Sequence, residues 1–198
     1  LNQKMIGRLD LAVQTYTKIV SLKPNNAGAH FGLGQLQYLN FNLEASRESF
    51  NKVIEFDPEN LVALVVLVEI EIKLKKYKRA LVQAQQLQKI HPDKSASYDM
   101  LGDVYIALNK PSVAIKHYKK SVSLKYRSET YIKLYSAYGR NRQIKKGFEE
   151  LTQWIEKYPQ DLQLKEVLAI TYQKQGEYKK ASDLYHEIIK HVKNNDRI

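Results

Sequence analysis

Residues 27–58 read AGAHFGLGQLQYLNFNLEASRESFNKVIEFDP, and residues 61–92 read LVALVVLVEIEIKLKKYKRALVQAQQLQKIHP. Both stretches end on a proline, and Pro58 and Pro92 are 34 residues apart, the same interval that separates Pro24 from Pro58. Each stretch holds two apolar segments at helical spacing. Proline cannot continue a helix. The sequence therefore predicts a repeated pair of helices with a period of 34 residues.

The second helix of each pair carries a small residue, a bulkier residue four positions later in most copies, and a third packing residue three positions after that. The small residues are Ala12, Ser46, Ala80, Ala114, Gly147 and Ala181. Spacings of four and three place these sites on one helical face. We expect the small residue to let the paired helices approach closely and the bulkier one to fill the space beside it.

These alignments predict six second helices. We expect them to run from Arg8 to Leu22, Leu43 to Phe56, Tyr77 to Ile90, Pro111 to Leu124, Ile144 to Lys157 and Tyr178 to His191. The turns before them are expected near Asn40, Lys75, Asn109, Arg142 and Gly176. What precedes Arg8 is expected to be the end of a truncated first helix.

The first helices repeat a bulky residue, a Leu-Gly or similar pair three residues on, and then an aromatic residue, as in Tyr98, Leu101-Gly102 and Tyr105. With the 34-residue period, this pattern resembles the tetratricopeptide repeat family. The resemblance implies an all-α, right-handed α-solenoid of about 5.5 helical hairpins. We expect a single array over residues 1–198, with units at 1–26 (partial), 27–60, 61–94, 95–127, 128–161 and 162–195. Neither end carries a capping helix, so we expect a fragment of a longer array.

Composition excludes several kinds of site. The chain has no cysteine, which rules out disulfides and thiolate metal ligands. There is no glycine-rich phosphate loop, and the five histidines are scattered over different units. Adjacent acids such as Glu149 and Glu150 point in different directions on a helix, so they do not form an acid–base pair. We therefore predict a protein that is not an enzyme and that holds no cofactor and no metal.

The resemblance implies that the first helices line a concave inner surface. The positions on that surface are expected to hold Phe31, Gln35, Tyr38, Val65, Glu69, Ile72, Asp99, Met100, Asp103, Ile132 and Ser136, with Val66 and Arg140 at related positions. Apolar contact supplies affinity and a few charges set the register of a partner. We predict that this groove binds a protein or peptide with apolar and basic residues.

An alternative surface follows from the charge. The formal net charge is +11, and residues 110–146 hold 11 Lys or Arg with Glu129 as their one acid. The candidate basic face is Lys116, Lys119, Lys120, Lys125, Arg127, Arg140, Arg142, Lys145 and Lys146. Tyrosines are interleaved with these bases, and bases with aromatic rings can bind nucleic acid or acidic polysaccharide. Such binding would be lost at high salt, whereas groove binding would tolerate it.

A narrower resemblance lies in the second half of the chain. The runs at 87–93, 101–103, 133–135 and 153–162 resemble the large tetratricopeptide lipoproteins of bacterial PEP-CTERM and exopolysaccharide systems. That resemblance implies an envelope protein of the periplasm or outer membrane, tethered by a lipid outside this sequence; without it, the cytoplasm is expected. No apolar run approaches the roughly 20 residues of a membrane helix.

Overall fold

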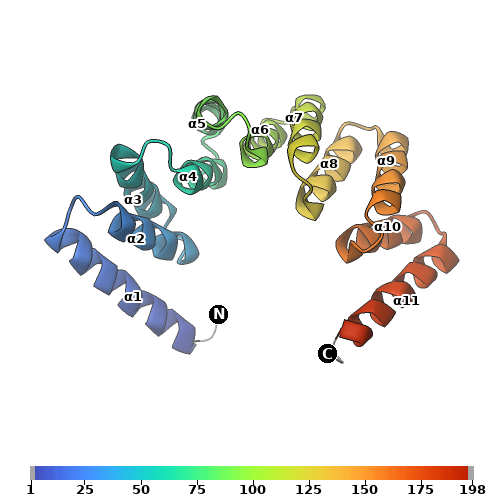
Figure 1. The fold of residues 1–198 in the computed structure, drawn as a ribbon, viewed down its shortest axis with the longest axis horizontal. Helices are drawn as coiled ribbons and strands as arrows, with labels where there is room; N and C mark the ends of the chain where they lie inside the picture. Colours follow the sequence, from blue (N-terminus) through green and yellow to red (C-terminus); the bar gives the residue numbers. More distant parts are fainter. Residues whose placement is uncertain (1–2, 196–198) are drawn as a thin grey trace. The chain divides into compact units, whose positions relative to one another are not determined.

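The computed structural model describes residues 3–195, which form eleven α-helices and no strand (Figure 1). The helices are α1 Gln3–Leu22, α2 Ala27–Leu39, α3 Leu43–Phe56, α4 Leu61–Lys73, α5 Tyr77–Ile90, α6 Ser95–Ala107, α7 Pro111–Leu124, α8 Ser128–Arg140, α9 Ile144–Lys157, α10 Leu162–Lys174 and α11 Tyr178–Asn195. They fall into two compact units, unit 1 (Leu1–Leu108) and unit 2 (Asn109–Ile198). Among the described helices, none has the length and hydropathy of a membrane span.

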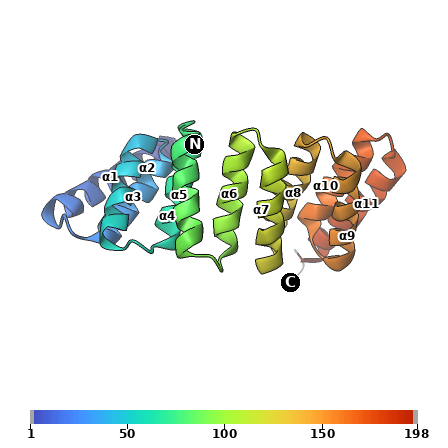
Figure 2. The same cartoon turned by 90° about the horizontal axis from the view of Figure 1, so that it is seen from above.

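Four of the predicted second helices, α3, α5, α7 and α9, begin and end at the predicted residues, and α11 continues beyond His191 to Asn195. The prediction for the start of the chain is wrong, because α1 runs unbroken from Gln3 through Arg8 to Leu22. Residues 3–7 contain no proline, and a glycine in a helix interior costs only about 1 kcal/mol. Gly7 therefore does not end the helix. Within each unit, consecutive helices alternate in direction (Figure 2).

The hairpin turns share one backbone conformation. Phe41, Lys75, Asn109 and Arg142 adopt φ values of 57–59°, and Gly176 adopts 81°. After α2, the Phe41 amide donates to the Tyr38 carbonyl (3.1 Å) and the Asn42 amide to the Gln37 carbonyl (2.9 Å). These bonds satisfy carbonyl groups at the helix end. The predicted turn positions are thus confirmed, although only one of them is a glycine.

The core of unit 1 is built mainly of aliphatic side chains with Phe50. One cluster contains Phe50, Val53, Ala63, Leu67 and Ile70; the other contains Leu64, Val68, Ala80, Ala84, Leu87, Met100, Leu101 and Val104. The small residues Ser46 and Ala80 are fully buried, as the repeat predicts. The Ser46 hydroxyl donates to the carbonyl of Gly34 (2.8 Å), which ties α3 to α2 at their closest approach.

The core of unit 2 is richer in aromatic rings. Tyr131, Leu151, Leu164 and Leu168 form its centre, and Trp154 packs on Tyr131 with ring centroids 4.5 Å apart. The buried tyrosines keep hydrogen-bonding hydroxyls, so polar partners must lie beside them. Tyr138, for example, donates to the carboxylate of Glu150 on α9.

Candidate partner-binding surfaces

The predicted groove residues of unit 1 lie on three successive first helices. α2 carries Phe31, Gln35 and Tyr38; α4 carries Val65, Glu69 and Ile72; α6 carries Asp99, Met100 and Asp103. Gln35 is exposed, and the others on α2 and α4 are half-buried. Phe31, Tyr38, Val65 and Ile72 also pack on the core clusters. These side chains therefore serve the fold with one side and are open to solvent on the other.

Two of the predicted groove residues are corrected by their burial. Asp99 is 3% exposed and Met100 is 5% exposed. Met100 belongs to the core cluster formed by α4, α5 and α6, because α6 packs against both preceding helices. A partner in the groove cannot reach these two side chains, and Asp103, which is half-buried, is the accessible acid of α6.

A pocket of about 360 Å³ opens on the groove side of α2. We call it the inner pocket, and its lining is Tyr16, Gly32, Gln35, Leu36, Tyr38, Leu39, Phe50 and Val66. Gln35 and Tyr38 were predicted as groove residues, and Val66 as a related position. A Cβ on Gly32 would lie 2.3 Å from Cε1 of Tyr16, so the Tyr16 ring lies directly on the α2 backbone. The absence of a side chain at Gly32 is what lets α1 form one wall.

Sequence reasoning missed Tyr16, Gly32, Leu36 and Leu39 as lining residues. A signal was present, because Gly32, Gln35, Leu36 and Leu39 follow the i, i+3, i+4, i+7 spacing of one helix face. Leu39 is 61% exposed. Apolar side chains on a helix face that points away from the core indicate a contact surface.

A polar contact links α2 to α4 beside the inner pocket. The Tyr38 hydroxyl donates to the Glu69 carboxylate (3.0 Å), and the Lys73 ammonium lies 5.5 Å from the centre of the Tyr38 ring. Burial, and then the charge and hydrogen bond of Glu69, raise the pKa of Tyr38 well above its usual value. The hydroxyl therefore stays protonated at neutral pH and holds Glu69 at the rim of the pocket.

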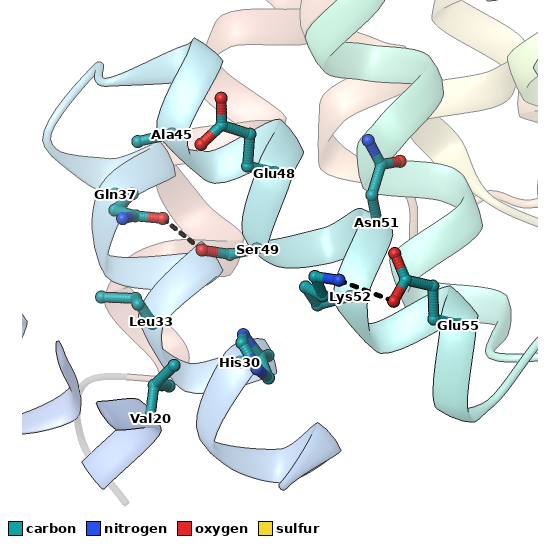
Figure 3. Close-up of a pocket in the computed structure, with 10 residues that line it drawn as sticks. All are labelled: Val20, His30, Leu33, Gln37, Ala45, Glu48, Ser49, Asn51, Lys52 and Glu55. Atoms are coloured by element: carbon teal, nitrogen blue, oxygen red, sulfur yellow. Dashed lines mark hydrogen bonds and ion pairs between the residues drawn. The ribbon is translucent and has the colours of Figure 1, made fainter. Parts of the chain in front are cut away.

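A second cavity of unit 1 lies on the opposite face of α2 and measures about 530 Å³ (Figure 3). Its α2 residues are His30, Leu33 and Gln37, at i, i+3 and i+7. Figure 3 shows Ser49 donating to Gln37 across the hairpin (2.7 Å). Most of the remaining wall comes from α3. None of the predicted groove residues lines this cavity.

Unit 2 separates the predicted basic face into two ends of α8. Lys125 and Arg127 lie at its start, whereas Arg140 and Arg142 lie at its end. The 13 residues of α8 span about 20 Å. The remaining predicted bases are Lys116, Lys119 and Lys120 on α7 and Lys145 and Lys146 at the start of α9. The predicted groove residues of unit 2 lie on α8, where Ile132 is half-buried and Ser136 is exposed.

Two of the predicted basic residues are engaged within unit 2. Lys119 forms an ion pair with Glu150 (2.7 Å) and lies over the ring of Tyr138 (5.7 Å). The hydrogen bond to Glu150 raises the pKa of Lys119. Arg127 forms an ion pair with Glu129 (2.6 Å). A polyanion would have to compete with these carboxylates.

The start of α10 forms a polar and aromatic cluster in unit 2. Asp161 caps α10 by accepting from the Leu164 amide (3.0 Å), and it also accepts hydrogen bonds from Tyr126 and Ser128. Tyr126 stacks on Tyr158 with centroids 3.8 Å apart. Burial and the bond to Asp161 raise the pKa of Tyr126 to about 12. No group of His, Asp or Glu among the described residues is arranged to hold a metal ion.

Comparisons with known proteins agree with this architecture. The family model described as the CNOT10 tetratricopeptide repeat domain matches residues 60–198, and a tetratricopeptide repeat model matches residues 6–60. Anaphase-promoting complex subunit 3 of Schizosaccharomyces pombe is 23% identical over 112 residues. That alignment covers 57% of this chain but only 17% of the subunit.

Solved structures show the same fold. Yeast Tom70 superposes with a TM-score of 0.72 at 21% identity, covering 89% of this chain and 38% of the Tom70 chain. YrrB, described as a TPR protein with an unusual peptide-binding site, superposes with a TM-score of 0.59 at 17% identity, covering 90% of this chain and 93% of its own. The predicted all-α helical repeat solenoid is confirmed.

Proposed function

Because this chain belongs to the family described as the CNOT10 tetratricopeptide repeat domain, we propose that it is a non-enzymatic scaffold that binds a protein or peptide partner. Tetratricopeptide repeat proteins bind protein or peptide partners. The binding surface that we propose is the groove side of α2 and α4 together with Asp103, and on α8 the residues Ile132 and Ser136.

The observation that carries the proposal is the inner pocket. Its volume of about 360 Å³ is enough for one or two large side chains, and its lining is mostly apolar or aromatic. Buried anchors in such pockets supply most of the energy of a peptide interface. We therefore propose that the partner inserts an apolar side chain between the Tyr16 ring and Leu36.

The charges beside the pocket favour a basic residue in the partner. Glu69 is held at the rim by Tyr38, and Asp103 lies on the same groove row one repeat further along. Acids beside an apolar pocket select a peptide in which a Lys or Arg follows the anchor, and this sets its register. The proposed partner is thus a peptide segment with an apolar anchor and a nearby base.

Selection from a random peptide library, followed by measurement of Kd for the enriched peptides, tests this proposal. The variant Gln35→Lys/Leu39→Lys changes two exposed side chains at the pocket and should weaken binding at least tenfold. Leu22→Lys is the matched control, because Leu22 is 72% exposed on the same unit and lies outside the pocket lining. Equal effects of the two variants, or enriched peptides without an apolar anchor, would contradict the proposal.

Polyanion binding through residues 110–146 is the weaker candidate. The exposed bases Lys116, Lys120, Lys145 and Lys146 favour it. The engagement of Lys119 and Arg127 by carboxylates, and the separation of the bases along α8, weaken it. Binding of nucleic acid or acidic polysaccharide that disappears between 50 mM and 200 mM salt, with no effect of the pocket variant, would favour this candidate.

Two finer expectations stay predictions. A bacterial envelope or exopolysaccharide-export setting rests on the lipoprotein resemblance, and fractionation of the native cells with an antibody to the chain checks it. A single array over residues 1–198 rests on the repeat phase, and the unfolding experiment described below checks it.

A further inference from the structure

The first turns of three second helices carry the same pattern, an apolar residue followed by two bases. α5 begins Tyr77-Lys78-Arg79, α9 begins Ile144-Lys145-Lys146 and α11 begins Tyr178-Lys179-Lys180. None of these first turns holds an acid. Since the pattern recurs at repeat spacing, it is a property of the hairpin turns and not of one stretch of sequence.

Helix stability does not explain these bases. The start of a helix carries a partial positive charge, so acids stabilise a first turn and bases oppose it. Arg140 and Lys174, in contrast, lie in the last turns of α8 and α10, where a positive charge stabilises the helix. The lysines at the starts of α9 and α11 therefore do not serve the helices that carry them, and a role outside the fold is indicated.

In unit 2 these bases gather on one edge. α10 packs against both α8 and α9, so the turns α8–α9 and α10–α11 belong to neighbouring hairpins. We call their basic residues the turn edge, namely Arg140, Arg142, Lys145, Lys146, Lys174, Lys179 and Lys180. All seven are exposed. Lys180 pairs with Glu177 (3.4 Å) and lies over the Tyr172 ring, and the other six make no ion pair with a side chain that the structure describes.

The opposite edge of unit 2 does not share this charge. Residues 139–147 and 173–181, at the turn edge, hold seven bases and one acid. Residues 123–131 and 156–164, at the loops that join successive hairpins, hold three bases and three acids. The excess charge of unit 2 is therefore directed to one side, as expected for electrostatic docking.

Two exposed apolar side chains are interleaved with the bases. Ile144 is 59% exposed and Tyr178 is 69% exposed. An Ile side chain gains nothing from a phosphate backbone or an acidic peptide, because it can neither stack nor hydrogen-bond. The headgroup region of a bilayer accepts Ile, Tyr and lysine stems together, while anionic lipids attract the charged heads.

We propose that the turn edge of unit 2 docks on an anionic lipid bilayer, with Ile144 and Tyr178 entering the headgroup region. Each Lys near an anionic surface contributes roughly a fivefold factor in partitioning. This surface is separate from the inner pocket of unit 1, so lipid docking and peptide binding can fail independently.

Co-sedimentation of the full chain with vesicles tests the proposal. We expect binding to phosphatidylcholine vesicles that contain 30% phosphatidylserine, little binding to pure phosphatidylcholine, and loss at 0.5 M NaCl. The variant Lys145→Gln/Lys146→Gln/Lys179→Gln/Lys180→Gln should lower the partition coefficient roughly a hundredfold or more. Its thermal stability should not fall, because bases are removed from first turns.

Two further variants keep the test specific. Lys116→Gln/Lys120→Gln/Lys125→Gln/Lys190→Gln removes the same charge from exposed positions of unit 2 outside the turn edge and should lower partitioning less than tenfold. Ile144→Ser/Tyr178→Ser should weaken binding while charge is unchanged. Equal losses in the two lysine variants would overturn the turn-edge assignment. Tighter binding to a 20-nucleotide single strand than to the anionic vesicles, or equal binding to neutral vesicles, would overturn the lipid assignment.

Discussion

Hairpin α2–α3 of unit 1 and hairpin α8–α9 of unit 2 have the same helix lengths but place their packing glycines on opposite helices. In α2–α3 the glycine is on the first helix, where a Cβ on Gly34 would lie 3.0 Å from the Phe50 ring. In α8–α9 it is on the second helix, where a Cβ on Gly147 would lie 2.9 Å from the Cβ of Tyr138. Close packing thus requires one small and one large partner, and either helix can supply the small one.

The two units also differ in how polar their cores are. Phe50 fills its site in unit 1 with no polar atom, whereas Tyr138 brings a hydroxyl that bonds Glu150 in unit 2. Tyr135 likewise bonds Thr171 (2.9 Å). Unit 2 also carries the charge excess, with 19 bases and 10 acids over residues 109–198 against 13 and 11 over residues 1–108. We therefore expect the packing of unit 1 to respond mainly to volume, and that of unit 2 to charge as well.

The largest expected effect comes from removing the large partner. Phe50 is fully buried, so Phe50→Ala should lower the free energy of unfolding by about 3–5 kcal/mol. Urea denaturation followed by far-UV circular dichroism measures this loss. Phe41→Ala, at a side chain that is 75% exposed, is the control and should change stability by less than about 0.5 kcal/mol.

The same variant tests the single-array prediction. Trp154 lies in unit 2, and it is the one tryptophan of the sequence. In a cooperative array, neighbouring repeats stabilise one another. Phe50→Ala should then also shift the unfolding midpoint reported by Trp154 fluorescence. An unchanged Trp154 midpoint would show that the two units unfold independently.

Glycine substitutions probe the exchanged roles of the helices. Gly→Ala in a helix interior ordinarily stabilises by about 0.5–1 kcal/mol. At Gly34 and Gly147 the added Cβ meets a neighbouring side chain, so each change should instead destabilise by about 1–3 kcal/mol. Gly139→Ala is the control, because nothing lies within 4 Å of its Cβ position, and it should stabilise. If Phe50→Leu fails to relieve the cost of Gly34→Ala, the proposed packing rule does not hold.

Buried carboxylates should respond with opposite signs in the two units. Glu71 in unit 1 is 1% exposed, lies 3.7 Å from Arg47, and has one oxygen without a hydrogen bond. Glu71→Gln should therefore stabilise by up to about 1 kcal/mol, because Arg47 keeps its ion pair with Glu44 (2.6 Å). Glu150→Gln in unit 2 should cost about 1 kcal/mol, because Lys119 and Tyr138 both lose a charged partner. Thermal unfolding of both variants checks the signs, and a loss of stability in the Glu71 variant contradicts the first.

The smallest effect is the pH dependence of the cluster at α10. Burial alone would raise the pKa of Asp161, but hydrogen bonds from Ser128 and Tyr126 outweigh it and lower the pKa below its usual value. A carboxyl whose folded pKa is lowered stabilises the fold above its unfolded pKa of about 4 and loses that contribution as the pH falls. The Trp154 unfolding midpoint should therefore fall below pH 4, and less so in Asp161→Asn, where the capping oxygen remains.

Alkaline titration gives the matching test at Tyr126. Its pKa is raised from about 10 to about 12, so its contribution to stability is complete below pH 10 and is lost as the pH rises toward 12. Ultraviolet absorbance of the phenolate, compared between the native chain and Tyr126→Phe, measures the shift. A Tyr126 that titrates at its ordinary value would show that the hydrogen bond to Asp161 does not persist in solution.

Much of the fold could be predicted from local pattern. The ends of α3, α5, α7 and α9 follow from the phase of the small residues and the prolines, because helix periodicity and helix breaking act over a few residues. The start of α1 could not, since a glycine only weakens a helix and does not compel a turn. The candidate site was partly accessible: Gln35 and Tyr38 were predicted, whereas Tyr16 was assigned only a packing role.

What the sequence alone determined is the repeat: the helix pairs, their turns and the face of each helix that is buried. Only the tertiary structure decided which groove positions remain open, because the burial of Asp99 and Met100 depends on how closely α6 packs on its neighbours. It also decided that Tyr16 closes the inner pocket over Gly32. The turn edge is a third case, because residues 34 apart lie on one side of unit 2 only once the hairpins stack, whereas neighbours in sequence along α8 are carried to opposite ends.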